Sequence, residues 1–402
     1  MACQGILQDT WGVVLGKPLI LVVLLVAMFA FAATTEERAE AAWNCTGTDI
    51  WPGDDIDAII NNDKADRATT FCVHAGTYKV SEVARLKAGD KLEAEPGKLD
   101  HVGPATKPNP VVELVGSGTE NLLSAFGNDI SITWVDLSGA SGTGQGTGSA
   151  IAAGSADSAF LVQYSRIHNN DSVGISNAKG RILDSEFFSN SEASGSIGFN
   201  ASAVKGITQF EAGRLYVHDE QGNGLWCDVG CDNDPDMPHG FWVHDSVVVR
   251  SERAGIRFEN SPNEALIENN EIHENGLKER RGGVDIRDSQ NATVKNNNFG
   301  PETIAGVSYA ANADKIGVRA TDSGRSGRVD LADISVIGNT MDGERIVSCG
   351  GQVSCSNNTS ASTLLSGSSL TVFSLPDPSA FMAQEFSTFS KRIFSTSART
   401  ED

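Results

Sequence analysis

Short runs of alternating apolar and polar residues recur through the middle of this 402-residue chain. Six four-residue blocks stack without gaps, with apolar residues at positions one and three. Apart from one Trp, positions two and four hold glycine, polar or charged residues. The blocks are Val173–Ser176, Ile197–Asn200, Leu225–Asp228, Ile256–Glu259, Val284–Arg287 and Ile316–Arg319, and their starts lie 24, 28, 31, 28 and 32 residues apart. One short strand recurring at a loosely fixed period is typical of a solenoid, in which each repeat stacks on its neighbours.

A second series of strands lies between these blocks and ends in polar corner residues. Its members are Phe160–Tyr164, Gly213–Val217, Ser246–Val249, Ala265–Asn270, Ala292–Asn297 and Ile334–Asn339. Asn269, Asn296 and Asn339 each follow a β-branched residue by two positions. Because Asn tolerates the left-handed backbone of a tight corner, they predict a ladder of side-chain amides bonded from coil to coil. Helix-period segments are hard to find after residue 65, which favours an all-β chain.

The two ends of the repeat region read differently. Asp54–Asn62 carries three isoleucines at helical spacing and predicts a short helix that caps the first coil and covers its strand edges. We therefore expect a lead-in and N-terminal cap over residues 42–69, the solenoid over residues 70–355, and a Ser/Thr-rich tail over residues 356–402.

An uncharged apolar run, Leu19–Ala33, precedes the lead-in. Its 15 residues are fewer than a membrane span needs, and they suit the apolar region of a secretory signal. Small-residue cleavage sites follow at Ala30–Ala32 and Ala39–Ala41. Residues 1–41 are thus predicted to be a signal peptide or, if uncleaved, an N-terminal membrane anchor. Both alternatives predict a secreted or cell-surface protein.

Export changes how the cysteines are interpreted. The six cysteines after the apolar run fall as three neighbouring pairs, and in an oxidising compartment they predict three local disulfides. The pairs are Cys45 with Cys72, Cys227 with Cys231, and Cys349 with Cys355. A zinc site at Cys227 and Cys231, with His239 nearby, is the alternative.

The chain is strongly acidic, with 52 Asp and Glu against 31 Lys and Arg and a formal net charge of −21. Such a surface repels nucleic acid, so we expect no nucleic-acid partner. An anionic polysaccharide is repelled as well, unless a local basic patch or a bound cation reverses the field.

With its strands, corners and period, the chain resembles the right-handed parallel β-helix repeat family, the pectin-lyase-like superfamily, over roughly residues 65–350. Thr70–Tyr78 and the turn Lys87–Leu92 are similar to the opening coils of such extracellular proteins. The segment Gly224-Leu225-Trp226-Cys227-Asp228 is similar to a "GLWxD" segment of exported bacterial members, with Cys227 where a large apolar residue is usual. The resemblance implies an all-β, right-handed parallel β-helix of roughly 9–12 coils.

The same resemblance leaves the activity open. The superfamily includes pectate and alginate lyases, polygalacturonases, uronan epimerases, phage tailspikes and adhesins, and a fold alone does not choose among them. The paired aspartates of the hydrolase branch are missing here. The stretch Asp234–His239 is only a loose echo of the Asp-Pro-His-Asp element of epimerases.

Stacking the blocks, about 4.8 Å apart, predicts two outward columns. Position four aligns Ser176, Asn200, Asp228, Glu259, Arg287 and Arg319, and position two aligns Gly174, Gly198, Trp226, Arg257, Asp285 and Gly317. Small residues at the ends and large polar residues in the middle indicate a shallow groove, in which an exposed Trp226 offers a face to a sugar ring.

Two mechanisms fit these residue types. In a lyase, Asp228 with Asp232 and Asp234 would hold Ca²⁺. Arg257, Arg287 or Arg319, with Glu259, would then supply the carboxylate partner and the base, while Asn200, Trp226 and Asp285 contact the sugar. In a retaining hydrolase, Asp228 and Glu259 would be acid and nucleophile, since neighbouring coils give about the right separation.

An ordinary alternative fits the same residues. Arg257 beside Asp285, and Glu259 beside Arg287, are also what cross-strand ion pairs on a solvated sheet look like. His218 and His244, each followed by Asp, fit either a general base held by its carboxylate or a hydrogen-bonded corner histidine.

The expected function is therefore the binding of an acidic, uronate-containing extracellular polysaccharide by a monomer. Cleavage by β-elimination and a role for Ca²⁺ stay open. The alternative from another class is a structural or adhesive surface protein without catalytic activity.

Overall fold

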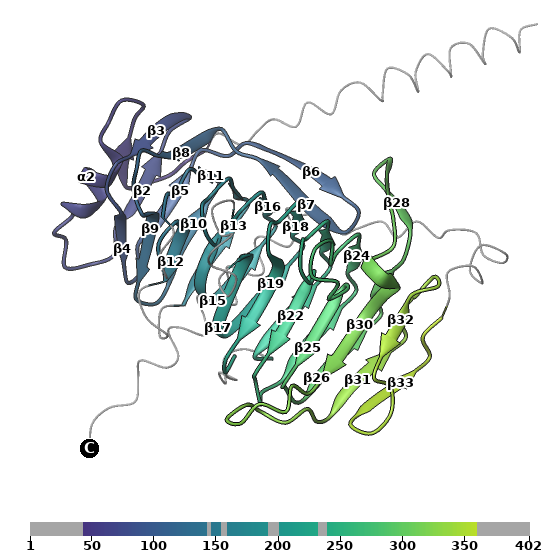
Figure 1. Ribbon diagram of the computed structural model, residues 1–402. Helices are drawn as coiled ribbons and strands as arrows, with labels where there is room; N and C mark the ends of the chain where they lie inside the picture. Colours follow the sequence, from purple (N-terminus) through teal and green to yellow (C-terminus); the bar gives the residue numbers. More distant parts are fainter. Residues whose placement is uncertain (1–42, 143–145, 154–158, 192–200, 232–238, 360–402) are drawn as a thin grey trace, which may run out of the picture.

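The described part of the chain winds into a stack of coils (Figure 1). The computed structural model describes residues 43–142, 146–153, 159–191, 201–231 and 239–359. A full coil places one strand on each of three faces, named A, B and C, in that order along the chain. On every face, strands of successive coils pair in parallel.

The strands of each face are given in their order along the stack. Face A contains β4 (Ala84–Lys87), β9 (Asn121–Phe126), β12 (Ser149–Ala153), β15 (Ile175–Leu183), β17 (Ser202–Gly213), β19 (Asn223–Asp228), β22 (Ile256–Glu259), β25 (Val284–Arg287), β30 (Ile316–Thr321) and β32 (Arg345–Val347). Face B contains β1 (Thr48–Ile50), β2 (Thr70–Val73), β5 (Lys91–Ala94), β10 (Ile130–Thr133), β13 (Phe160–Gln163), β15, β17, β20 (Phe241–His244), β23 (Ala265–Glu268), β26 (Ala292–Lys295), β31 (Ile334–Ile337) and β33 (Val353–Ser356). Face C contains β3 (Gly76–Val80), β8 (Val112–Gly116), β11 (Val135–Ser138), β14 (Arg166–His168), β16 (Glu186–Phe188), β18 (Tyr216–His218), β21 (Val247–Val249), β24 (Glu271–His273) and β27 (Asn298–Phe299).

These rows confirm the predicted all-β, right-handed parallel β-helix and its number of coils. Faces A and B share β15 and β17, which run through the corner between them, so the two rows form one 20-stranded sheet, while face C is a 9-stranded sheet. The inward residues form one continuous core. Leu225, Ile256, Val284 and Val318 occupy one register position in successive coils, and none of the four is exposed.

A ladder of asparagine side chains follows the corner between faces B and C. Asn270 Nδ2 donates to Asn297 Oδ1 at 2.9 Å, and Asn297 Nδ2 donates to Asn339 Oδ1 at 3.0 Å. The predicted ladder is thus right for Asn339 and one residue early in the two coils before it. Asn269 and Asn296 instead supply the left-handed turn, with φ of 57° and 55°, which Gly338 supplies in the third coil.

The N-terminal cap is a single short helix, α2 (Ile56–Asn61), as predicted. The Asp55 side chain accepts a hydrogen bond from the Ala58 backbone N–H and so caps the helix. Ile56 and Ile60 are buried against the first coil, while Ile59 is partly buried against the same core. Strand β1 already lies within the predicted lead-in.

Both ends of the chain lie outside the described residues, and with them the predicted signal or anchor and most of the tail. Within the described part, no helix has the length and apolarity needed to cross a membrane.

The three predicted disulfides are present. They join Cys45 to Cys72, Cys227 to Cys231 and Cys349 to Cys355. Because Cys227 and Cys231 are bonded to each other, the zinc alternative is wrong. The first disulfide ties the lead-in to β2, so it fixes the first coil to the chain that precedes it.

A β-hairpin, named the strap, crosses the outside of face C. It consists of β6 (Lys98–Val102) and β7 (Ala105–Asn109) and reaches from the early coils towards the late ones (Figure 1). Thr106 Oγ1 donates to Asp184 at 3.0 Å, and the Thr106 backbone N–H donates to the Arg214 carbonyl. Near its tip the strap meets a second hairpin, β28 (Glu302–Ile304) and β29 (Val307–Tyr309), because Ala105 packs in one cluster with Ile304 and Tyr309.

Candidate functional site

Two outward columns run along face A, and their register differs in part from the prediction. Lys205, Trp226, Arg257, Asp285 and Arg319 occupy one register position in successive coils. Asp228, Glu259, Arg287 and Thr321 occupy the next outward position. The three central blocks were therefore aligned correctly, while Arg319 belongs to the column of Asp285 and not to that of Arg287.

The misalignment has a simple physical cause. Side chains alternate with a period of two along a strand, so a shift by two residues keeps the same set of residues inward. The hydrophobic pattern of the last block is therefore the same before and after such a shift. The same holds for the first block, in which Ser176 pairs with Lys205 and so belongs to the column of Trp226. The block Ile197–Asn200 lies outside the described residues, and Lys205 of β17 takes the position before Trp226 in the column.

Trp226 does not offer a face to a sugar, which corrects the prediction. It is only 3% exposed, because two cations from neighbouring coils cover its ring. The Lys205 ammonium lies 4.1 Å from the ring centroid, and the Arg257 guanidinium lies 5.2 Å from it. Cation–π contacts of this kind favour an enclosed ring, so Trp226 supports the charged residues around it.

Arg257 is held in a network of buried ion pairs. Its Nη2 lies 2.6 Å from Glu259 Oε1, and its Nη1 lies 3.8 Å from Asp285 Oδ2. The Arg257 side chain is 5% exposed. A guanidinium enclosed in this way is not available as a base, and among the predicted catalytic residues Arg257 and Glu259 are bonded to each other beside Asp285.

A pocket of about 430 Å³ opens on face A beside this network. It is lined by Glu279, Arg281, Asp285, Arg287, Arg319, Thr321, Asp322 and Ser323. Three of the predicted residues therefore meet in one pocket: Asp285, Arg287 and Arg319. Sequence reasoning missed Glu279 and Arg281, which come from the turn between faces C and A.

That turn covers one side of Asp285. Arg281 Nη1 lies 3.5 Å from Asp285 Oδ2, and Arg253 bonds to Glu279 at 2.8 Å on the other side of the turn. The signal in the sequence was the charged run Glu279-Arg280-Arg281 directly before a glycine pair. Glycine pairs allow the close approach of a covering turn, and a Cβ on Gly282 would lie 2.3 Å from the Ile316 carbonyl oxygen.

Burial dominates the electrostatics of Asp285. Loss of solvation raises the pKa of its carboxyl to about 6, although the Arg257 and Arg319 guanidinia favour the ionised form. Asp285 is 3% exposed. A carboxyl with a pKa near neutrality at the wall of a pocket can exchange a proton with a bound molecule.

Arg287 and Arg319 are the cations of the pocket that lack a close partner. The nearest carboxylate to Arg287 is Asp288, with Nε 3.7 Å from Oδ2, which is too far for a hydrogen bond. Within the described residues the Arg319 guanidinium makes no hydrogen bond or ion pair. Both side chains are half-buried, so they present their donors to the pocket rather than to open solvent.

The predicted calcium site finds no support among the described residues. Asp228 is paired with Lys205 at 3.0 Å, and in the described part of the chain no three acidic, His or Cys side chains gather as a metal site would require. Asp232, Asp234 and Asn200 lie outside the described residues. The calcium site therefore stays a prediction, with Asp228 paired to Lys205 within the described residues.

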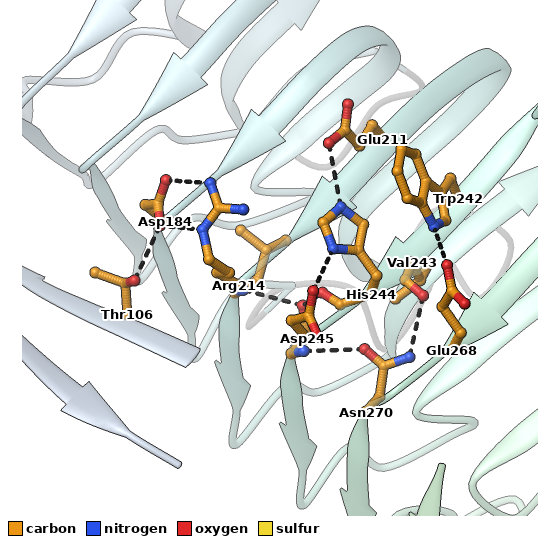
Figure 2. Close-up of polar contacts among 12 residues, drawn as sticks. Thr106, Asp184, Glu211, Arg214, Trp242, Val243, His244, Asp245, Glu268 and Asn270 are labelled. Carbon is orange, nitrogen blue, oxygen red and sulfur yellow. Dashed lines mark hydrogen bonds and ion pairs between the residues drawn. The ribbon is translucent and has the colours of Figure 1, made fainter. Parts of the chain in front are cut away.

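In the two Val-His-Asp steps, which lie on faces B and C, each histidine bonds to two carboxylates. On face B, His244 Nδ1 lies 2.8 Å from Asp245 and Nε2 lies 3.1 Å from Glu211 (Figure 2). Burial disfavours the imidazolium, but the hydrogen bonds to Asp245 and Glu211 outweigh it and raise the pKa of His244 to about 9. His218 on face C bonds in the same way to Asp219 and Glu186. Two carboxylates on one imidazole favour a cationic, structural histidine over a general base.

Comparison with known proteins assigns no activity. No family model and no curated protein matches the chain. Among solved structures, an alginate lyase from Paenibacillus is 13% identical with a TM-score of 0.44, covering 74% of this chain and 95% of its own. A surface protein and adhesin of Streptococcus pneumoniae is 13% identical with a TM-score of 0.41, covering 75% and 83%. A mannuronan C-5 epimerase module of Azotobacter vinelandii is 13% identical with a TM-score of 0.38, covering 76% and 94%.

All three TM-scores lie below 0.5, so these likenesses carry no argument about this chain. The predicted parallel β-helix is confirmed by the strand pairing of the chain itself, while the GLWxD segment stays a prediction. The strand register of the chain itself identifies it as a right-handed parallel β-helix protein.

Proposed function

We propose that the protein binds an acidic polysaccharide along face A, with a uronate carboxylate held by Arg287 and Arg319. The observation that carries the proposal is the pair of half-buried guanidinia without a close partner in a pocket of about 430 Å³. A guanidinium recognises a carboxylate through two parallel hydrogen bonds, and partial burial strengthens each of them.

The charges that line the pocket support a polyanionic ligand despite the acidic net charge of the chain. Its lining carries three arginines and three acidic residues, one of which, Asp285, has a pKa raised to about 6. The local charge is therefore near zero or positive in a chain of net charge −21. A polyanion is therefore repelled less at this pocket than the net charge of the chain suggests.

We further propose that the pocket cleaves the bound chain by β-elimination. Pairing of the uronate carboxylate with Arg287 and Arg319 acidifies the proton at C5, and ionised Asp285 takes that proton. The electron pair of the C5–H bond forms the C4–C5 double bond, and the C4–O bond breaks. The departing oxygen takes a proton from water, so the products are a shortened chain and an unsaturated uronate.

Binding is tested with polygalacturonate, alginate and hyaluronan by titration calorimetry. Arg287→Gln and Arg319→Gln should each weaken binding about 10-fold or more, the typical value of a hydrogen bond to a charged group. The matched control is Arg85→Gln, an exposed residue of the same face near its N-terminal end. Equal affinity of all variants for every polymer would contradict the proposed site.

Cleavage is tested separately by the ultraviolet absorbance of the unsaturated product. Wild type should produce it, and Asp285→Asn should not. Binding without any absorbance would retain the binding site and refute the elimination. Repeating the assay with added calcium and with a chelator tests the expectation that Asp232 and Asp234 bind a calcium ion.

A further inference from the structure

A second polar cluster lies on face C, away from the pocket. Asp136, Arg166 and Glu186 occupy one outward register position in successive coils, so their charges alternate along the stack. His168 and Phe188 form the neighbouring column. The cluster is unusual in how its hydrogen bonds are distributed.

Arg166 turns towards one of its two acidic neighbours. Its Nη2 lies 2.7 Å from Asp136, whose second oxygen lies 2.8 Å from His168 Nε2. On the other side, Glu186 bonds through Oε1 to His218 at 3.1 Å. The charges of Asp136 and Glu186 are thus each compensated, but Arg166 and Glu186 do not bond to each other.

Three buried polar atoms of this cluster have no hydrogen-bond partner among the described residues. They are Arg166 Nε, His168 Nδ1 and Glu186 Oε2. Glu186 is 2% exposed, so water does not reach this oxygen from the open surface. A buried oxygen or nitrogen left without a partner costs about 1–3 kcal/mol, so three on two adjacent strands favour binding of a group that supplies their hydrogen bonds.

A hydroxyl has the chemistry that these three atoms require. A further charge is not called for, because the ion pairs with Asp136 and Glu186 already balance the cluster. What is left over is one donor at Arg166, one acceptor at Glu186 and one imidazole nitrogen at His168. A hydroxyl accepts from the first, donates to the second and leaves its neighbouring hydroxyl for the third.

The surroundings suit a sugar that carries such hydroxyls. Phe188 stacks between His168 and His218, at centroid distances of 4.5 and 5.0 Å, and presents an apolar edge beside the polar atoms. Lys107 of the strap covers Glu186 from outside, but its Nζ lies 3.6 Å from Oε1, beyond hydrogen-bond distance. This side chain is 45% exposed, so it can swing away and admit a ligand.

We propose that Arg166, His168 and Glu186 form a second carbohydrate site, which binds a neutral sugar residue through its hydroxyl groups. The site is independent of the pocket on face A. Through this site the protein would bind neutral glycans whether or not an acidic polymer occupies the pocket on face A.

The test uses the full chain in native affinity electrophoresis, in gels containing starch, xylan, galactomannan or hydroxyethylcellulose. Wild type should be retarded by at least one polymer. Glu186→Gln removes the unpaired acceptor, and Arg166→Lys removes the unpaired Nε while an ammonium can still pair with Asp136. Each should weaken retardation about 3- to 10-fold, the typical effect of one hydrogen bond.

Face B supplies matched controls. Glu211 makes the same bond to a histidine as Glu186, but its second oxygen is occupied by Arg181 Nε at 2.8 Å. Glu211→Gln and Arg181→Lys therefore carry the same chemical changes in a cluster whose hydrogen bonds are complete, and they should leave retardation unchanged. Thermal unfolding of all four variants separates loss of binding from loss of fold.

Two results would overturn the proposal. One is the absence of retardation in every gel, or retardation that Glu186→Gln and Arg166→Lys leave intact. The other is a crystal structure, grown with an oligosaccharide of the retarding polymer, that shows an ordered water only between Arg166 and Glu186.

Discussion

Arg257 Nη2 lies 2.6 Å from Glu259 Oε1, two residues further along the same strand. Both side chains point outward from β22, yet the Arg257 side chain is 5% exposed and that of Glu259 12%, and the guanidinium lies over the ring of Trp226. The pair therefore faces outward from the sheet but contributes to stability as a buried ion pair does. By contrast, the half-buried Arg287 and Arg319 are available to a ligand.

Replacing Arg257 should cost stability, whereas replacing Arg287 should not. Arg257→Met leaves Glu259 without its cation and removes one of the cations beside Asp285, and breaking a buried pair in this way costs about 3–5 kcal/mol. Arg287→Met removes a half-buried cation with no close partner, so the free energy of unfolding should hardly change. Urea denaturation of the two variants measures the difference, and equal losses would show that Arg257 is not enclosed as described.

The raised pKa of Asp285 predicts a particular dependence of stability on pH. Its folded pKa of about 6 lies above the ordinary value of 3.8, so between these values the folded state holds a proton that the unfolded state has lost. This carboxyl therefore destabilises the protein as pH rises from about 4 to 6, by about 3 kcal/mol in total. Asp285→Asn should abolish that decline in unfolding experiments across this range. A wild-type and a variant curve that run parallel would contradict it.

His244 should also make stability fall as pH rises, but at alkaline pH. Its folded pKa of about 9 lies above the ordinary 6.5, so its stabilisation is complete below pH 6.5 and is lost as pH rises through 9. His244→Gln should remove this loss of stability, measured by thermal unfolding between pH 6 and 10. His239→Gln is the control, because its partner Glu264 is half exposed and such surface pairs contribute little.

The corner ladder gives a prediction for two adjacent residues. Asn297 is buried and donates to the Ile267 carbonyl at 2.9 Å as well as to Asn339, so Asn297→Ala should destabilise the protein by about 2–4 kcal/mol. Asn296 only supplies the left-handed turn, so Asn296→Gly should be neutral. Denaturant unfolding of both variants measures the difference. An equal loss of unfolding free energy would show that Asn297 is not the ladder residue of this coil.

The sequence predicted the coils because each inward residue contributes independently to an apolar core. The alternation of apolar and polar residues around Leu225, Ile256 and Val284 predicts each strand from its local sequence alone. The same local pattern also located Asp285, Arg287 and Arg319 on one face. It could not set the register of Arg319, because a shift by two residues preserves the pattern.

The burial of Trp226 was beyond the sequence for a different reason. Its environment depends on Lys205 and Arg257, which approach from neighbouring coils, and on turns whose path the repeat does not encode. Arg281 shows the same limit, because a residue in a variable turn has no periodic partner. The strap is the extreme case, since no repeat predicts where an inserted hairpin will lie.

The strap has a consequence for the order in which the chain can reach its final form. In a solenoid each coil needs only its predecessor, so the early coils can be completed while later ones are still being made. Here Thr106 waits for Asp184 and Arg214, and Ala105 waits for Ile304 and Tyr309. During synthesis from the N-terminus, the strap can therefore bond to face C only after Arg214 has appeared, and Ala105 can complete its contacts only after Tyr309 has appeared. The strap starts in the early coils, but its packing is completed only when the late coils have formed.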